Sequence, residues 1–345
     1  MLSARTKGIF VEKGLFRTMV AVTSSSVEPF VIEKLEELPG DMSGDLMRER
    51  MLALFEGGKN ARYASCFTSV FPQGRFFLRH SVETPVKLKE AGFFDELLRS
   101  MGVDVAQNSV GIINAADGRV FDPSRNLSAQ RELMICGAPV AEFKAAQEDF
   151  LASGIFPERM ELGSLSMLGS LTDYARFASK KKPVLYLELG LASCSLFIVS
   201  AERVDLCRVI PHGIDSMLPV LGQELGVTDA ASARNLLFSN TFDFTEMGPT
   251  LLGKLLREMR ASTGFYEVQT GQSIGSVVVH LIPQSLDWTR LCIARSLGLE
   301  LMEFNYADWL ASRKVNPAPG LNLGALHQGW IGVLGMMPDF SIAAS

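Results

Sequence analysis

The strongest constraint in this sequence is a pair of apolar runs joined by a short turn that contains glycine. Residues 184–189 and 194–199 are apolar at nearly every position, and Gly190-Leu-Ala-Ser193 separates them. Short apolar runs bounded by turn-forming residues are typical of buried strands, so this segment predicts a β-hairpin. A further apolar run at residues 204–210 predicts a third strand. The second half of the chain therefore opens as a β meander.

The first half opens in a similar way. Apolar and polar residues partly alternate at residues 8–11, 15–22 and 28–38, with turn-forming residues between them, which predicts three strands. Apolar residues at helical spacing over 43–55 predict a helix after this meander. Because both halves then continue into alternating helices and strands, the pattern indicates an internally duplicated α/β protein.

The segment between the two meanders has a different character. From residue 63 to about 124, short apolar stretches surround one predicted helix at 93–101, which is typical of a small α+β domain inserted into a larger one. A strand at 132–138, a helix at 141–152, a strand at 159–162 and a helix at 164–177 are predicted to follow. We therefore expect a first subdomain at residues 1–62 and 125–182, an inserted subdomain at 63–124 and a second half at 183–345.

The second half continues mainly as helices. Helices are predicted from Gly213 onward, at 229–237 and at 248–265, which gives a helical part at about 217–270. A strand at 276–282, a helix at 285–296 and a final helix near 321–334 complete the chain.

Charge and composition exclude several classes of protein. The formal net charge is −5, and the one dense basic run is Lys180-Lys181-Lys182, so nucleic acid is not expected as the main partner. The five cysteines are widely spaced in apolar surroundings, which favours buried thiols in a reducing compartment. No apolar run long enough for a signal peptide precedes Glu12 and Lys13, and no run reaches the ~18 to 20 apolar residues of a membrane span. We expect a soluble, cytoplasmic protein whose contact with a membrane comes through a partner.

The order of several motifs resembles that of a known family. Glu188-Leu-Gly190 is followed by Ser193, Ser195, a strand, Arg208 and then Gly213 before a helix. The order along the chain of four other segments also matches: two before this motif, at 69–79 and 132–162, and two after it, at 256–266 and 297–301. This pattern resembles the PilM family of type IV pilus assembly proteins, which are related to FtsA within the actin-like ATPase superfamily. The resemblance implies an actin-like α/β fold, with two RNase H-like halves and a small inserted α+β domain.

The resemblance also implies where a nucleotide would bind, if a nucleotide site survives. In this superfamily, glycine hairpins surround the phosphates of ATP, and an acidic residue before the glycine holds Mg²⁺ or water. The matching positions in this chain are Glu12, Gly14, Glu188, Gly190, Ser193 and Ser195. The alternative for Gly190 and Ser193 is an ordinary hairpin turn.

Two of the expected nucleotide elements depart from the family pattern. Leu15 and Phe16 follow Gly14, where small residues are expected near the phosphates. The adenosine loop should contain two adjacent glycines after the strand at 276–282, but the sequence has no glycine between Gly275 and Gly298. Because a Cβ collides with a closely bound nucleotide, we expect a degenerate site, no ATP hydrolysis and no cofactor. ATP with Mg²⁺ remains the alternative.

Other chemistry has little support in the sequence. The four histidines are scattered, without the paired spacing of metal ligands, and there is no Cys-x-x-Cys motif. Ser193 and Ser195 lack the Gly-x-Ser-x-Gly context of a hydrolase nucleophile. We therefore expect neither a metal site nor a catalytic serine.

The resemblance implies a scaffold that binds proteins. In the PilM family, an extended cytoplasmic peptide of a single-span membrane protein like PilN lies between the first domain and the inserted domain. This places candidate peptide contacts at Arg75, Phe76, Phe77, Leu78 and Arg79, although these residues also fit a strand with one buried face. Other components of the pilus or secretion machine are further expected partners, and a homo-oligomer stays open. The competing hypothesis is an active nucleotide-dependent protein, either a kinase-like enzyme for sugars or acetate or an ATP-driven filament former.

Overall fold

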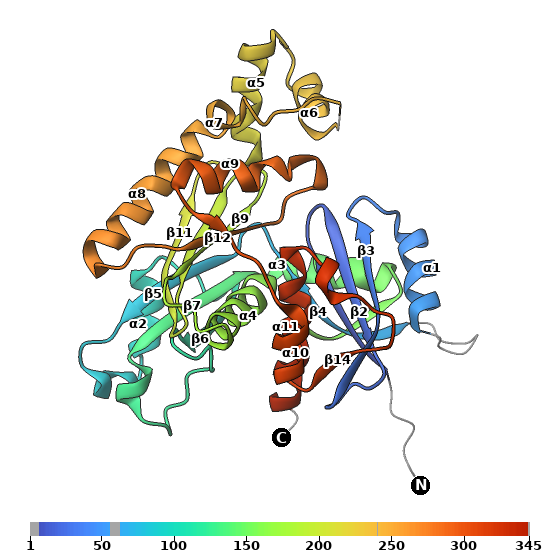
Figure 1. The fold of residues 1–345 in the computed structure, drawn as a ribbon. Coiled ribbons are helices and arrows are strands. Elements are labelled where there is room, and N and C mark those ends of the chain that lie inside the picture. The colour runs from blue at the N-terminus through green and yellow to red at the C-terminus, as the bar shows by residue number, and fades with distance from the viewer. Residues whose placement is uncertain (1–6, 56–62, 240, 344–345) are drawn as a thin grey trace. The chain divides into compact units, whose positions relative to one another are not determined.

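The computed structural model describes residues 7–55, 63–239 and 241–343. The chain divides into unit 1, formed by Met1–Leu171 with Asn305–Ser345, and unit 2, formed by Thr172–Phe304. Each unit is built around its own sheet, and unit 1 carries a second, smaller sheet (Figure 1).

The main sheet of unit 1 has six strands in the order β14-β3-β2-β1-β4-β8. The strands are β1 (Gly8–Lys13), β2 (Arg17–Thr23), β3 (Phe30–Pro39), β4 (Ala64–Val70), β8 (Ile155–Leu162) and β14 (Val315–Pro317). The first three form an antiparallel meander, and β4 pairs in parallel with β1. Both β8 and β14 are also parallel to their neighbours, β4 and β3.

The sheet of unit 2 has five strands in the order β11-β10-β9-β12-β13. The strands are β9 (Val184–Leu189), β10 (Cys194–Val199), β11 (Val204–Ile210), β12 (Ser276–His280) and β13 (Glu300–Leu301). Strands β9, β10 and β11 form an antiparallel meander. On the other side of β9, β12 pairs in parallel with β9, and β13 pairs in parallel with β12. This order and these directions repeat β3-β2-β1-β4-β8, so the predicted duplication is confirmed.

Alternation along β1 explains how the main sheet of unit 1 is covered. Ile9 and Val11 lie in a core with Phe150, which belongs to a helix on that face. Phe10 and Glu12 point to the opposite face because successive strand residues alternate. On that opposite face, Gly332 lies against the carboxylate of Glu12. The helices around this sheet are α1 (Gly44–Phe55), α3 (Val140–Ala152), α4 (Gly163–Phe177), α10 (Tyr306–Ser312) and α11 (Ile331–Ala343).

Unit 2 has the helical part that the sequence predicts. Its helices are α5 (Leu218–Leu225), α6 (Ala230–Phe238), α7 (Gly248–Leu251), α8 (Gly253–Thr270) and α9 (Trp288–Leu297), with 3₁₀ turns η3 (Ile214–Met217) and η4 (Gln284–Leu286). Asp229 caps α6, since its carboxylate accepts a hydrogen bond of 2.8 Å from the backbone N–H of Ser232.

The small sheet has three antiparallel strands in the order β5-β7-β6. Its elements are β5 (Phe76–Ser81), η1 (Pro85–Lys89), α2 (Phe93–Ser100), β6 (Asn108–Asn114), η2 (Leu127–Gln130) and β7 (Glu132–Pro139). Leu133 and Ile135 of the central strand pack with Leu97 and Leu98 of α2 in a core of its own. The small sheet and its helices thus form the small α+β module inserted in the first half.

The structure divides the chain differently from the expected boundaries in two places. The strand at residues 64–70 pairs with β1 in the main sheet, whereas the strand at 132–139 belongs to the small sheet, so the small sheet spans 76–139 instead of 63–124. Residues 305–345 belong to unit 1 instead of the second half, since β14 pairs with β3. Both differences depend on which strands pair, which the local apolar pattern does not encode.

Two predicted elements in the last quarter of the chain also differ from the structure. The strand predicted at 276–282 ends at His280 because Leu281 adopts a left-handed conformation with φ of 60°. The helix predicted near 321–334 is instead two 3₁₀ turns, η5 (Leu323–Ala325) and η6 (Gln328–Trp330), followed by α11. Among the described residues, no helix is both long enough and apolar enough to cross a bilayer.

Candidate functional site

Strand β5 is one edge of the small sheet, and its main-chain groups point alternately toward β7 and away from it. The Val82 N–H donates a hydrogen bond of 2.9 Å to the Arg131 carbonyl, and this pair continues the β5–β7 register. Hydrogen-bonded pairs alternate along an antiparallel ladder, so every second residue of β5 directs its main-chain groups to β7. These residues are Phe76, Leu78 and His80. The others direct theirs to the outer edge: Phe77, Arg79 and Ser81.

The opposite edge of the small sheet is partly covered. The Asn114 N–H donates to the Arg119 carbonyl at 2.8 Å, and the Phe121 N–H donates to the Ile112 carbonyl at 2.9 Å. Residues 119–121 therefore fold back along β6. In the described part of the chain, no strand pairs with the outer side of β5. An edge strand of this kind can accept an added strand through its backbone.

The side chains predicted to contact a peptide are engaged within unit 1. Phe76 and Leu78 pack against the core of the small sheet, and Phe77 is buried. Arg79 donates to the carboxylate of Glu132 at 2.8 Å. Arg75 donates to the Pro72 carbonyl at 2.8 Å and to the Ser164 hydroxyl at 3.1 Å. The outer edge of β5 therefore offers main-chain groups more than these side chains.

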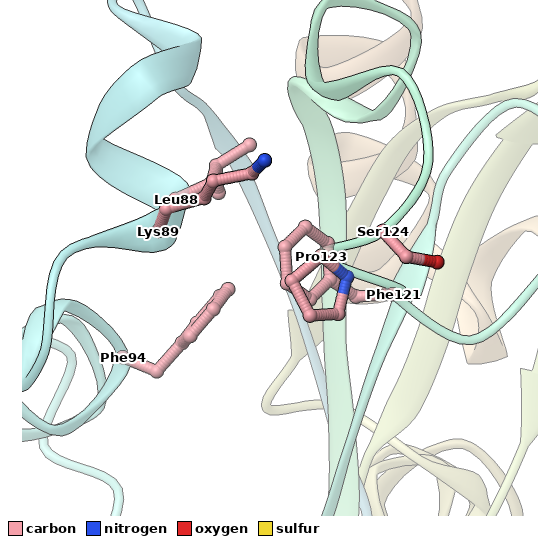
Figure 2. A pocket seen from close by; sticks show the side chains of 6 residues that line it. All are labelled: Leu88, Lys89, Phe94, Phe121, Pro123 and Ser124. Carbon is pink, nitrogen blue, oxygen red and sulfur yellow. The ribbon is translucent and has the colours of Figure 1, made fainter.

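A shallow apolar groove opens on the same small domain (Figure 2). Its volume is about 690 Å³. Residues of η1 and α2 form one wall and the loop after β6 forms the other, with these lining residues: Leu88, Lys89, Phe94, Phe121, Pro123 and Ser124. Three of these six residues, Leu88, Phe94 and Phe121, also belong to the hydrophobic core of the small sheet, so the groove is an opening onto that core.

Three polar residues lie side by side on the main sheet of unit 1. Glu12 of β1 is in register with Ser69 of β4, which is in register with Glu161 of β8. Glu161 accepts a hydrogen bond of 2.5 Å from Ser166 on α4. Burial raises the pKa of the Glu161 carboxyl, although the hydrogen bond from Ser166 and the nearby Arg159 act in the opposite direction.

Glu12 is held against helix α11. Its side chain is 1% exposed, and a Cβ added at Gly332 would lie 2.2 Å from its Oε2 atom. A larger residue at position 332 would displace both this carboxylate and Met167, whose sulfur would lie 2.8 Å from the added atom. The position of Glu12 therefore depends on a glycine that lies far away in the sequence.

The turn after β1 is closed by its own backbone. The Gly14 N–H donates to the Arg17 carbonyl at 3.0 Å, and the Phe16 carbonyl accepts from the Gly40 N–H at 2.9 Å. A Cβ at Gly40 would lie 2.5 Å from the Leu15 carbonyl oxygen, so this close approach requires glycine. The Gly14 N–H is thus bonded within the turn and the Phe16 carbonyl is bonded to Gly40, and Leu15 is 45% exposed beside them.

In unit 2, Glu188 is fully buried near the end of β9. Its Oε1 atom accepts a hydrogen bond of 2.9 Å from the hydroxyl of Tyr186. Strand pairing places Ser195 of β10 on one side of Glu188 and His280 of β12 on the other. The acidic residue that the family resemblance singles out therefore has a buried polar neighbour on each side.

The turn after Glu188 is joined to the first helical turn that follows β11. The Gly190 N–H donates to the Ser193 carbonyl at 3.0 Å, which closes the hairpin. The Ile214 N–H donates to the Gly190 carbonyl at 3.0 Å, and the Asp215 N–H donates to the Leu191 carbonyl at 2.9 Å. The carbonyl groups of Gly190, Leu191 and Ser193 are therefore hydrogen-bonded within unit 2.

The segment after β12 does not fit the glycine loop that the resemblance implies for adenosine. Leu281 has the left-handed φ of 60° that glycine adopts without strain, yet it carries a buried side chain. Ile282 is also buried, and Pro283 follows it. Buried side chains therefore occupy the segment for which the resemblance implies glycines. Within the described residues, no cluster of histidine, cysteine or acidic side chains could hold a metal ion.

Comparison with known proteins decides the fold class. No protein-family model matches the sequence, and no curated protein matches it. Among solved structures, the chain is similar to a chain of the PilM-PilN type IV pilus biogenesis complex, with a TM-score of 0.67 and 17% identity over 98% of this chain and 99% of that chain. The chain has a PilM-like, actin-like ATPase fold. Identity this low shows the shared fold alone.

Two further structures are similar at a lower level. One is the cytoplasmic domain of EpsL, an inner membrane component of the type II secretion system of Vibrio cholerae, with a TM-score of 0.43, 8% identity, and coverage of 97% of this chain and 95% of that chain. The other is Ta0583, an archaeal actin homolog, with a TM-score of 0.41, 11% identity, and coverage of 99% of each chain. The fold assignment rests on the PilM-PilN structure.

Within this PilM-like fold, the predicted site residues fall into three places. Glu12 lies in β1 of the main sheet of unit 1 and Gly14 in the turn after β1, whereas residues 75–79 lead into β5 of the small sheet and form most of it. Glu188, Gly190, Ser193 and Ser195 lie together on the hairpin of β9 and β10. The sequence did not reveal that His280 lies beside Glu188, or that Glu161 lies two strands from Glu12 with Ser69 between them. Their proximity follows from parallel pairing between strands far apart in the chain, which leaves no local sequence signal.

Proposed function

We propose that this protein is a scaffold of a type IV pilus-like or secretion machine that binds an extended cytoplasmic peptide of a PilN-like single-span membrane protein. The observation that carries this proposal is the outer edge of β5, with which no strand pairs in the described part of a chain that has a PilM-like fold. The similar solved structure is named as a complex of PilM with PilN. The protein would work in the cytoplasm and reach the inner membrane through this partner.

The geometry of β5 specifies how such a peptide would bind. Main-chain hydrogen bonds to the outward-directed residues would hold the peptide, and alternate peptide side chains would supply specificity. A short peptide held in this way reaches about micromolar affinity, roughly 8 kcal/mol. That affinity suffices when several copies are confined at a membrane surface.

We also propose that the protein is not an ATP-hydrolysing enzyme. The side chains of Leu281 and Ile282 are buried in the loop where the family resemblance implies bare glycine. The turn at Gly14 is closed by its own backbone and carries Leu15 and Phe16. These features favour a degenerate nucleotide site and a function that depends on partner proteins.

The sharpest test of peptide binding removes one outward-directed N–H from β5. Ser81→Pro removes the N–H of Ser81, while the matched control Ser81→Ala keeps it, and both lose the hydroxyl hydrogen bond to Glu132. The probe is a synthetic peptide with the N-terminal cytoplasmic sequence of the PilN-like protein from the same organism. We expect Ser81→Ala to bind like the wild type and Ser81→Pro to bind about five- to tenfold more weakly by calorimetry.

Hydrogen exchange gives a second readout of the same proposal. Peptide binding should slow exchange of the amides of Phe77, Arg79 and Ser81 more than exchange of amides already bonded to β7. Equal peptide affinities for Ser81→Pro and Ser81→Ala, with no slowing along β5, would show that the peptide binds elsewhere.

A further inference from the structure

Helix α8 of unit 2 has one face in the core and one face in solvent. The buried face is formed by Leu255, Leu256, Met259, Ser262 and Tyr266. With 100° of rotation per residue, five exposed residues fall within about 40° of a single line on the opposite side. They form what we call the exposed stripe: Lys254, Arg257, Ala261, Phe265 and Val268.

The two ends of the exposed stripe differ in chemistry. Phe265 is 57% exposed and Val268 is 87% exposed, so the C-terminal end presents apolar surface to solvent. Lys254 and Arg257 form the basic N-terminal end, and neither has an ion-pair partner within the described parts of the chain. In contrast, the neighbouring Glu258 is paired with Arg208 at 2.6 Å. The stripe therefore combines two available cations with an uncovered aromatic ring and an uncovered valine.

The spacing of the exposed stripe is symmetric about Ala261. Arg257 and Phe265 are each four residues from Ala261, and Lys254 and Val268 are each seven residues from it. In an antiparallel pair of α8 helices centred on Ala261, the guanidinium of Arg257 in one copy would face the ring of Phe265 in the other. Lys254 would face Val268 in the same way. Every contact would then be made twice, as twofold symmetry requires.

We propose that the exposed stripe of α8 binds a second copy of this chain in antiparallel orientation. Arg257 supplies a cation–π contact to Phe265 of the second copy, and the aliphatic stem of Lys254 covers Val268. Ala261 and Gly264 permit close approach of the two helices, and a Cβ at Gly264 would meet no atom within 4 Å. This surface belongs to unit 2, so the proposal does not depend on peptide binding at β5.

The expected dimer is weak in solution. A single helix from each copy buries less surface than a standard stable interface, so the dissociation constant should be on the order of 100 µM. Confinement of several copies on one membrane-bound assembly raises their effective concentration above this value. The dimer would therefore form mainly where the chain is recruited in several copies.

The test is sedimentation of the full chain over a range of concentrations, with variants that exchange the two facing residues. Phe265→Arg places arginine opposite arginine and should weaken dimerisation at least tenfold. The double variant Arg257→Phe with Phe265→Arg restores one arginine opposite one phenylalanine and should recover the dimer. Val209→Ala, which shortens an exposed apolar side chain on β11, is the matched control and should dimerise like the wild type. Thermal unfolding should be the same for all four proteins, because every substituted side chain is exposed.

A cysteine at the symmetry axis provides an independent measurement of register. Ala261→Cys should form a disulfide-linked dimer on mild oxidation, whereas Glu267→Cys, which lies off the stripe, should form much less. A wild-type chain that stays monomeric at all concentrations would overturn the proposal. A double variant that fails to recover the dimer would also overturn it. Binding of the monomeric chain to vesicles of anionic phosphatidylglycerol through Phe265 would assign the stripe to a membrane surface instead.

Discussion

At the scale of single residues, Glu37 is a contact point between two distant segments of unit 1. Its carboxylate accepts from Arg17 at 2.6 Å and from the Nε2 atom of His327 at 2.8 Å. His327 Nδ1 accepts from the Gly329 N–H, so Nε2 carries the hydrogen that is donated to Glu37. These bonds join β2 and β3 to the segment that leads into α11.

Glu37 gives a pH-dependent prediction. The hydrogen bond from His327, with a further contribution from Arg17, holds the pKa of Glu37 below its usual value although burial opposes this effect. A carboxyl with a lowered folded-state pKa stabilises the fold above its unfolded-state pKa, and this stabilisation is lost as the pH falls through the folded-state value. We expect Glu37→Gln to lower the free energy of unfolding by about 1 kcal/mol at neutral pH, because the pair is partly exposed to solvent.

The measurement is urea unfolding from neutral pH down to about pH 3, below the ordinary glutamate pKa. The difference in stability between wild type and Glu37→Gln should shrink as the pH falls below about 4. Glu49→Gln, an exposed position on α1, is the control and should not change stability at any pH. A constant difference across the whole range would show that the charge of Glu37 does not contribute.

At the scale of elements, the junction between the β9–β10 hairpin and η3 depends on Gly213. The φ of Gly213 is −112°, so its conformation alone does not require glycine. A Cβ there would lie 2.4 Å from the carbonyl oxygens of both Gly190 and Leu191. Because these are backbone atoms held in the hairpin turn, they cannot move aside without breaking the turn. Close approach therefore makes glycine necessary at this position.

Substitution of Gly213 tests this junction. We expect Gly213→Ala to lower the free energy of unfolding by about 2 to 4 kcal/mol, through overpacking against the turn. Gly169→Ala is the matched control, because a Cβ there meets no atom within 4 Å and the residue lies inside α4. The control should be as stable as the wild type or up to about 1 kcal/mol more stable. Equal urea midpoints for the two variants would mean that the close contact between the hairpin and η3 does not contribute to the free energy of unfolding.

At the scale of the whole molecule, the actin-like fold makes ATP binding and ATP hydrolysis the activities to test. We expect no appreciable ATP hydrolysis by the purified chain with Mg²⁺, since Leu281, Ile282, Leu15 and Phe16 replace the bare backbone that phosphates and adenosine need. Phosphate release should equal that of buffer, and calorimetry with ATP and Mg²⁺ should show no binding. Turnover that disappears in Glu188→Ala would contradict this expectation and favour a nucleotide-dependent function.

Much of the whole-molecule architecture could be predicted from local patterns. The hairpin around Gly190 and the meander from Gly8 to Pro39 were recognisable because buried strands have short apolar or alternating runs. The duplication followed from finding this arrangement twice. The strand at residues 76–81 was also within reach, since residues 75–79 fit a strand with one buried face.

The sequence by itself determined most of the strands, several of the helices and the repeated order of the two halves, because burial of one face leaves a periodic trace in the chain. The short strands β13 and β14 and the helix α10 were not predicted. The tertiary structure alone decided which strands are neighbours. It placed β4 in the main sheet and β7 in the small one, paired β14 with β3, and left β5 at an edge. It also set Glu161 beside Ser69 and His280 beside Glu188. An apolar pattern records that a face is buried but not what covers it, and the choice of neighbour depends on packing between segments distant in sequence.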